Sequence, residues 1–193
     1  HCTPDGYCVG CTGNKYFLQT PPLSAFRASV AFSFGHVDRN CGISLYFGYD
    51  PDTFCGQELR IDWKKDTQQM RFILFSITGE VTKEIASRTE EGVAFPSFGD
   101  TLHLDFELNA GGISAHIGAA EVFFDGSFAA NGYFGFSRPH FIGSVTFSEV
   151  SVCTDLIPEM QGAPLLVEIP MVNGGTMPLT MEYSVFKVKE RNY

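Results

Sequence analysis

One short segment carries the side chains best suited to acid–base chemistry. In HLDFEL, His103, Asp105 and Glu107 alternate with apolar residues, and residues two apart in a strand point to the same side. Two carboxylates on one face can serve as acid and nucleophile in retaining glycoside hydrolysis, which needs them about 5 Å apart. Asp105 and Glu107 are therefore candidate catalytic residues. The alternatives are that these side chains contact a glycan without catalysis or form an ordinary solvated face.

A second polar set alternates in the segment ELRIDW. Glu58, Arg60 and Asp62 face away from Leu59, Ile61 and Trp63, and Trp63 is expected in the core. If this segment and HLDFEL contribute to one surface, their polar side chains would form a concave face able to hydrogen-bond a glycan. Arg60, Asp62 and His103 are therefore candidate ligand-binding residues.

Aromatic residues outside the predicted core offer flat apolar faces for sugar rings. Tyr46 points away from Ile43, Leu45 and Phe47 in the segment GISLYFGY. Tyr49 and Phe141 fall in predicted loops, where binding residues concentrate. We predict Tyr46, Tyr49 and Phe141 as ligand-binding residues.

Three cysteines, Cys2, Cys8 and Cys11, stand within the first eleven residues, HCTPDGYCVGC. The C-x-x-C spacing suits a tetrahedral zinc ion if further ligands are supplied. Six cysteines in the chain could also close three disulfides. Disulfides joining this loop to the rest of the domain are our first interpretation, and they favour an extracellular location. Reduced structural thiols and zinc coordination by Cys2, Cys8 and Cys11 are the alternatives.

Spacing along a predicted hairpin excludes one cysteine pair. Cys41 and Cys55 would lie at opposite ends of two antiparallel strands joined by YDPDTFCG. That separation is about 20 Å, whereas a disulfide needs Cα atoms within about 7 Å. The same loop contains Asp50 and Asp52, which are candidate ligands for a structural calcium ion, although turns favour Asp on their own account. No cofactor is predicted to be required.

The segments that must position these residues are strands. Apolar and polar residues alternate in FRASVAFSF, where Phe26, Val30 and Phe34 share one face, and about nine later segments repeat the pattern. Turn-forming sequences separate them, and no amphipathic stretch of helical length competes. The sequence predicts an all-β protein with an antiparallel two-sheet β-sandwich.

The composition of the chain argues against two classes of binding partner, nucleic acids and membranes. The chain has 193 residues, 44% of them hydrophobic, and a net charge of -9 with an isoelectric point near 4.9. An acidic protein repels phosphate backbones and anionic lipid surfaces, so we expect no nucleic acid partner. No run is long and apolar enough for a membrane span, so we expect no membrane partner.

The segment NGYFGFSRPHFIGSVTFSEVSV, residues 131–152, pairs a glycine-aromatic-glycine strand with a final alternating strand. It resembles the closing hairpin of concanavalin A-like lectin and glucanase domains, and YFLQTPPLSAFRASVAFSF resembles their opening; the resemblance covers roughly residues 16–153. It implies a jelly roll of two curved sheets that binds a carbohydrate ligand on its concave face. HLDFEL departs from the glucanase signature, with two acids instead of three. Gly132 and Gly135 would permit bending and close approach of the backbone.

The composition of the chain changes near residue 155, after which prolines become frequent. We assign residues 1–155 to the jelly-roll sandwich with its cysteine-rich leading loop. Residues 156–193 form an extended arm or the start of a further β domain. We expect a carbohydrate-binding or lectin-like module, part of a larger glycan-processing protein. A glycoside hydrolase, or an assembly domain that pairs with further domains or chains through residues 156–193, is the alternative.

Overall fold

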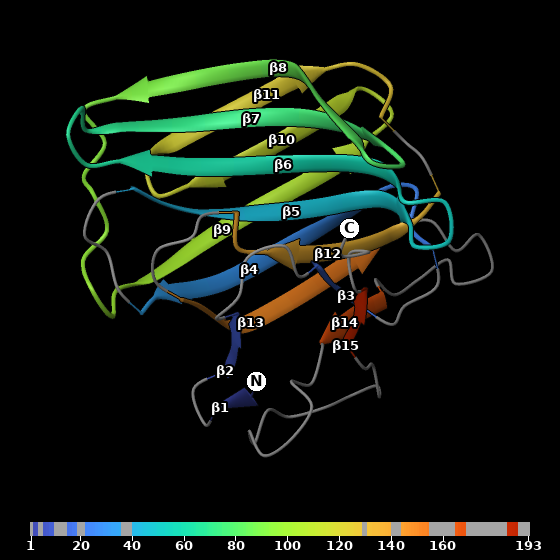
Figure 1. Cartoon of the computed structure of the whole chain (residues 1–193), viewed down its shortest axis with the longest axis horizontal. Coiled ribbons are helices and arrows are strands. Elements are labelled where there is room, and N and C mark those ends of the chain that lie inside the picture. Colours follow the sequence, from blue (N-terminus) through green and yellow to red (C-terminus); the bar gives the residue numbers. More distant parts are fainter. Residues whose placement is uncertain are drawn as a thin grey trace.

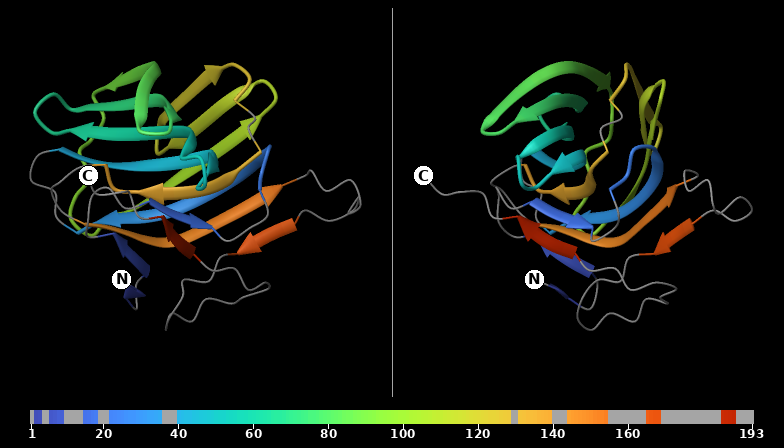
Figure 2. Two further views of the ribbon diagram at one scale, coloured as in Figure 1. Left: turned by 45° about the vertical axis from the view of Figure 1, so that its right-hand side comes forward. Right: turned by 90° about the vertical axis from the view of Figure 1, so that its right-hand side faces the viewer.

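The computed structural model of the chain is an all-β sandwich of two antiparallel sheets. It describes residues 2–3, 6–9, 15–18, 22–35, 40–128, 131–139, 144–154, 165–168 and 185–188. Within these ranges there is no helix, and hence none long and apolar enough to cross a membrane. Figure 1 shows the two sheets stacked face to face with their strands crossing at an angle, and Figure 2 shows the two layers from the side.

Sheet A has the strand order β1-β2-β13-β4-β9-β10-β11, with β14 also paired to β13. Sheet B has the order β15-β3-β12-β5-β6-β7-β8. The strands of sheet A are β1 (Cys2–Thr3), β2 (Gly6–Val9), β4 (Phe26–Phe34), β9 (Thr101–Asn109), β10 (Gly112–Ile117), β11 (Ala120–Asp125), β13 (Val145–Thr154) and β14 (Leu165–Glu168). Those of sheet B are β3 (Lys15–Leu18), β5 (Asn40–Asp50), β6 (Cys55–Lys64), β7 (Gln69–Thr78), β8 (Val81–Glu91), β12 (Tyr133–Ser137) and β15 (Val185–Val188).

The core lies between the sheets and is rich in phenylalanine. Phe32 and Phe106 of sheet A and Phe47 of sheet B are at most 1% exposed, as the alternation in each strand predicts. Trp63 is also buried in this core, where its ring packs on Phe34 with the centroids 5.7 Å apart. The predicted burial of one face of each strand is confirmed at these positions.

Close approach of three strands in sheet B requires glycine. Gly135 on β12 opposes Phe17 of β3, and a Cβ at this position would lie 2.5 Å from the carbonyl oxygen of Tyr16. A Cβ on Gly132 would run into the backbone of Gly48. The role predicted for Gly132 and Gly135, which is to let backbones approach closely, is confirmed.

The hairpin of β5 and β6 fixes the positions of two cysteines. Cys41 opposes Trp63, and Asp50 opposes Cys55, so the two cysteines lie at opposite ends of the hairpin. Their predicted separation is confirmed. Cys41, Cys55 and Cys153 are free thiols. The first interpretation, disulfides that join the leading loop to the rest of the domain, is wrong, because the three cysteines outside that loop are free. The backbone of Cys2 lies in β1 and that of Cys8 in β2, whereas Cys11 lies outside the described residues, so the zinc role predicted for these three remains a prediction.

Two strands of the structure lie after residue 155, where the composition of the sequence changes. β14 pairs antiparallel with residues 151–154 of β13 in sheet A, and β15 pairs antiparallel with β3 in sheet B. β14 therefore extends sheet A, and β15 extends sheet B.

Candidate functional site

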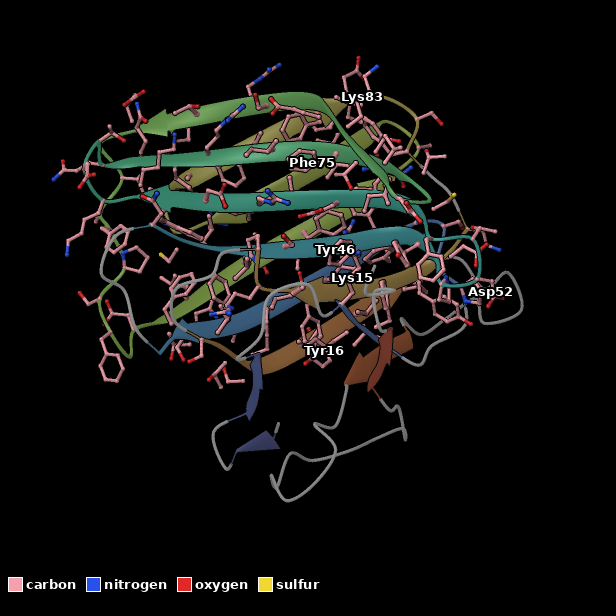
Figure 3. All side chains as sticks on the ribbon, in the orientation of Figure 1. Lys15, Tyr16, Tyr46, Asp52, Phe75 and Lys83 are labelled. Carbon is pink, nitrogen blue, oxygen red and sulfur yellow. The ribbon has the colours of Figure 1, made fainter. Side chains whose placement is uncertain are left out.

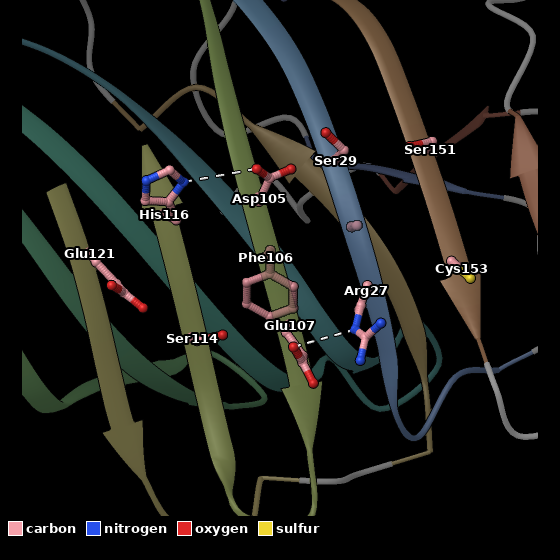
Figure 4. Close-up of a pocket in the computed structure, with 11 residues that line it drawn as sticks. Arg27, Ser29, Asp105, Phe106, Glu107, Ser114, His116, Glu121, Ser151 and Cys153 are labelled. Atoms are coloured by element: carbon pink, nitrogen blue, oxygen red, sulfur yellow. Dashed lines mark ion pairs between the residues drawn. The ribbon is translucent and has the colours of Figure 1, made fainter. Parts of the chain in front are cut away.

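A shallow pocket of about 290 Å³ lies on the outer face of sheet A, and we call it the sheet A pocket (Figure 4). It spans five neighbouring strands, β13, β4, β9, β10 and β11. Its lining residues are Arg27, Ala28, Ser29, Asp105, Phe106, Glu107, Ser114, His116, Glu121, Ser151 and Cys153. Eight of these eleven residues have side chains that donate or accept hydrogen bonds.

Strand register places these side chains in two rows that run across the sheet. The first row consists of residues directly opposite one another on five strands: Ser151, Ser29, Asp105, His116 and Glu121. The second row, one pleat away, consists of Cys153, Arg27, Glu107, Ser114 and Phe123. The rows face outward because the intervening residues, such as Phe106 and Phe124, are buried in the core.

Two ion pairs cross from strand to strand in this pocket. Nδ1 of His116 lies 3.9 Å from Oδ2 of Asp105, and Nε of Arg27 lies 3.4 Å from Oε2 of Glu107 (Figure 4). Asn109 also donates a hydrogen bond of 3.1 Å from Nδ2 to Oε1 of Glu107. The Arg27 and Asp105 side chains are 67% and 65% exposed. Exposed ion pairs are weak, so these groups remain accessible to a ligand.

Phe123 is an exposed aromatic residue on this face. It is 54% exposed and lies directly opposite Ser114 on β10. Sequence reasoning missed this residue, although the signal was present in EVFFD. There Val122 and Phe124 are buried and Glu121, Phe123 and Asp125 are exposed. An exposed ring beside hydrogen-bonding side chains is the usual composition of a sugar-binding surface.

The predicted polar residues fall on two different sheets. His103, Asp105 and Glu107 lie on β9 of sheet A, whereas Arg60 and Asp62 lie on β6 of sheet B. The expectation that both sets form one concave surface is wrong, because the outer faces of the two sheets point in opposite directions. The alternation of residues within a strand shows which of them share a face, but it does not show which sheet the strand joins.

On the outer face of sheet B, the polar side chains bond to one another. Oγ of Ser44 donates a hydrogen bond of 2.6 Å to Oε1 of Glu58. Nε and a terminal nitrogen of Arg60 each donate to the same Glu58 oxygen over 3.0 Å. The Arg60 guanidinium also stacks over the ring of Phe75, 4.7 Å from its centroid. Ser44 is 0% and Glu58 3% exposed, so the centre of this network is hidden from solvent, and Asp62 on the same strand is 9% exposed.

Tyr46 and Tyr49 belong to the same outer face but are buried. Tyr46 is 5% and Tyr49 0% exposed, and both pack with Phe17 and Ile77 in a small cluster. Nζ of Lys15 lies 5.5 Å from the centre of the Tyr46 ring (Figure 3). These two rings therefore offer little surface for stacking on a sugar. Phe141 lies outside the described residues, and its predicted role stays a prediction.

The expected loop position of Tyr49 is wrong, because Tyr49 lies within β5. The pairing of β5 with β6 shifts between Phe47 and Asp50, and Gly48 has a φ of 55°. This bulge brings Tyr49 onto the face of Tyr46, where the two rings are 5.9 Å apart. The sequence signal for such a bulge is Gly48 itself, because glycine readily adopts a positive φ.

Of the two aspartates proposed for calcium, Asp50 is the last residue of β5 and Asp52 lies in the turn between β5 and β6. Oδ2 of Asp50 accepts a hydrogen bond of 2.8 Å from the Thr53 hydroxyl, and Oδ1 accepts one of 2.9 Å from the backbone N–H of Asp52. These hydrogen bonds, Thr53 first, lower the pKa of Asp50 below its usual value. Among the described residues, no three His, Cys, Asp or Glu side chains are grouped so as to hold a metal ion.

Comparison with known proteins places the fold. No protein-family model and no curated protein matches the chain. Among solved structures, a CBM66 carbohydrate-binding module from Bacillus subtilis is 14% identical, with a TM-score of 0.55 over 78% of this chain and 92% of the module. A tetrameric galectin from the ball sponge Cinachyrella sp. is 17% identical, with a TM-score of 0.52 over 70% of this chain and 97% of the galectin.

An ancestral congerin is 11% identical, with a TM-score of 0.51 over 71% of this chain and 98% of that protein. The sequence identities are low, so the likeness concerns the arrangement of strands. Two antiparallel sheets, no helix among the described residues and these structural neighbours agree with the fold that residues 16–153 resemble. The chain has the concanavalin A-like jelly-roll fold.

Proposed function

We propose that this domain binds a carbohydrate at the sheet A pocket, as a module of a larger glycan-processing protein. The observation that carries the proposal is the position of the exposed Phe123 ring beside an accessible pocket of hydrogen-bonding side chains. Carboxylates and guanidinium groups bond sugar hydroxyls, and an aromatic ring packs on the apolar face of a sugar. The similarity in fold to a carbohydrate-binding module and to galectins supports carbohydrate binding in general.

The proposal is tested with the Phe123→Ala variant. Glycan-array screening identifies a ligand, and isothermal titration calorimetry compares the variant with the wild type. Removal of the ring should cost about 1.5 kcal/mol of binding free energy, or roughly tenfold in affinity. Because Phe123 is 54% exposed, its removal should leave the fold intact.

Phe98→Ala is the matched control. Phe98 is 72% exposed. It lies just before Thr101, the first residue of β9. At 3.3 Å per residue, Thr101 is about 20 Å from Glu107 along that strand. This variant should bind as the wild type does. The absence of any glycan ligand, or an equal effect of both substitutions, would contradict the proposal.

Glycoside hydrolysis is the second candidate function. Asp105 and Glu107 are next-but-one neighbours on β9 and both line the sheet A pocket. Asp105→Asn and Glu107→Gln keep the shape of each side chain and remove its negative charge. Hydrolysis that either substitution abolishes would favour an enzyme, whereas binding without hydrolysis that survives both would favour a module.

A further inference from the structure

We infer that the sheet A pocket takes an extended, uncharged glycan chain that lies across the strands. The inference rests on the proposed function and adds the class and the orientation of the ligand. It follows from the direction in which the polar rows run and from the charges that line them.

The rows run across the sheet and are longer than one sugar. The row from Cys153 to Phe123 crosses five strands, which at about 4.8 Å between strands is about 19 Å. Arg27 lies near one end of this row, and the Phe123 ring lies at the other. One sugar unit cannot contact both groups, whereas a chain of several units lying along the row can.

The shape of the site agrees with a chain that passes over the surface. The pocket lies on the outside of a sheet, and its charged side chains are largely exposed, with Arg27, Asp105 and His116 each more than half exposed. No described segment is packed over these side chains. An open surface of this kind accepts the middle of a chain as well as its end.

The charges of the lining favour hydroxyl groups over acidic groups. Three carboxylates, Asp105, Glu107 and Glu121, and one guanidinium, Arg27, line the described pocket. The protein also carries a net charge of -9. A uronate, sialate or sulfate group in this pocket would lie within the screening length of about 8 Å of several carboxylates. Like charges at that distance weaken binding.

An amine-bearing glycan is less suited than a neutral one. Two of the three carboxylates already face a cationic or protonatable side chain, since Glu107 pairs with Arg27 and Asp105 lies beside His116. An ammonium group could pair with Glu121, but at the other two carboxylates it would have to displace one of these partners. The hydroxyls of a neutral sugar can bond to the remaining oxygens while both pairs stay in place.

The inference is tested with three matched sets of oligosaccharides. Neutral galactan and cello-oligosaccharides, from monosaccharide to hexasaccharide, are compared with oligogalacturonates and with chitosan oligosaccharides by calorimetry. Affinity for the neutral ligand should rise at least about tenfold from monosaccharide to tetrasaccharide. The acidic chain should bind at least about tenfold more weakly than the neutral one.

Glu121→Lys provides the test of charge. Glu121 lies opposite His116 on the edge strand β11, and its replacement should reduce the discrimination against oligogalacturonates severalfold. Asp66→Lys is the matched control, because it changes the net charge equally but lies on the exposed turn between β6 and β7 of sheet B. It should leave the discrimination unchanged.

Each outcome decides a separate point. Neutral binding that does not increase with chain length would overturn the extended ligand. Preference of the wild type for the acidic or the amine-bearing chain would overturn the charge argument, and equal effects of Glu121→Lys and Asp66→Lys would do the same. Binding to none of the three sets, together with a glycan array that detects no ligand, would overturn the proposed function itself.

Discussion

Replacement of Gly135 by alanine should destabilise the fold through one close contact between strands. Gly135 lies on β12, opposite Phe17 of β3 and Tyr46 of β5. A Cβ at this position would lie 2.5 Å from the carbonyl oxygen of Tyr16 and 2.5 Å from Cδ1 of Phe17. Ordinary contact begins at 3.4 Å, so the new methyl group is about 1 Å too close to both atoms.

The expected loss in the free energy of unfolding depends on which atoms would have to move. The Tyr16 oxygen belongs to the backbone of β3, so relief requires β3 and β12 to separate, and the Phe17 ring is 0% exposed. Overpacking of this kind costs about 3 kcal/mol at the upper end of its range. Alanine recovers about 1 kcal/mol by restricting the unfolded chain. The net loss in the free energy of unfolding should be about 2 kcal/mol.

Urea denaturation followed by fluorescence measures this loss. Trp63 is the single tryptophan of the chain and is 2% exposed, so its emission reports unfolding of the core. With a slope of about 2 kcal/mol per molar urea, the midpoint should fall by about 1 M. Gly111→Ala is the control, because the nearest atom to its Cβ is the side-chain oxygen of Asn109 at 3.3 Å. A Gly135→Ala midpoint equal to that of the control would refute the reasoning.

Two further predictions concern titratable groups. Because hydrogen bonds from Thr53 and the Asp52 backbone lower the pKa of Asp50, they stabilise the fold above the unfolded-state pKa, and that contribution is lost as pH falls through the folded-state value. Thr53→Ala should raise the pKa of Asp50 in an NMR titration, and an unchanged titration would contradict this cause. Burial, and then the negative charge of Asp62, raise the pKa of Cys41 to about 12. In mass spectrometry, iodoacetamide should therefore alkylate Cys41 slowly in the folded protein and readily in urea, and equal rates would disprove its burial.

Local alternation was enough to predict most of the strands, because the side-chain period of a strand is set by the backbone alone. Phe32, Phe47, Trp63 and Phe106 are buried as the pattern requires. The loop predicted at Tyr49 was wrong, because the strand continues through a bulge at a left-handed glycine, which adds a residue and changes the face. Such a bulge depends on the pairing of two strands, which one strand's sequence does not contain.

Only those residues of the candidate site that lie together on one strand could be predicted from the sequence. His103, Asp105 and Glu107 share the outer face of β9, as their spacing indicates. Their neighbours Arg27 and His116 come from β4 and β10, and only the register of the sheet brings them together. The expected union with Arg60 and Asp62 required β6 and β9 to contribute to one surface, which the sheet order rules out.

The two outer faces differ in what a ligand would have to displace. On sheet B, Tyr46, Tyr49 and Glu58 are each at most 5% exposed and are held by neighbouring side chains. A sugar could reach them only after those packed groups moved, which would cost part of the binding energy. On sheet A, Phe123 and Arg27 are more than half exposed, and a sugar would displace mainly water. The conspicuous tyrosines of the sequence are therefore poorer candidates for recognition than one phenylalanine in an alternating strand.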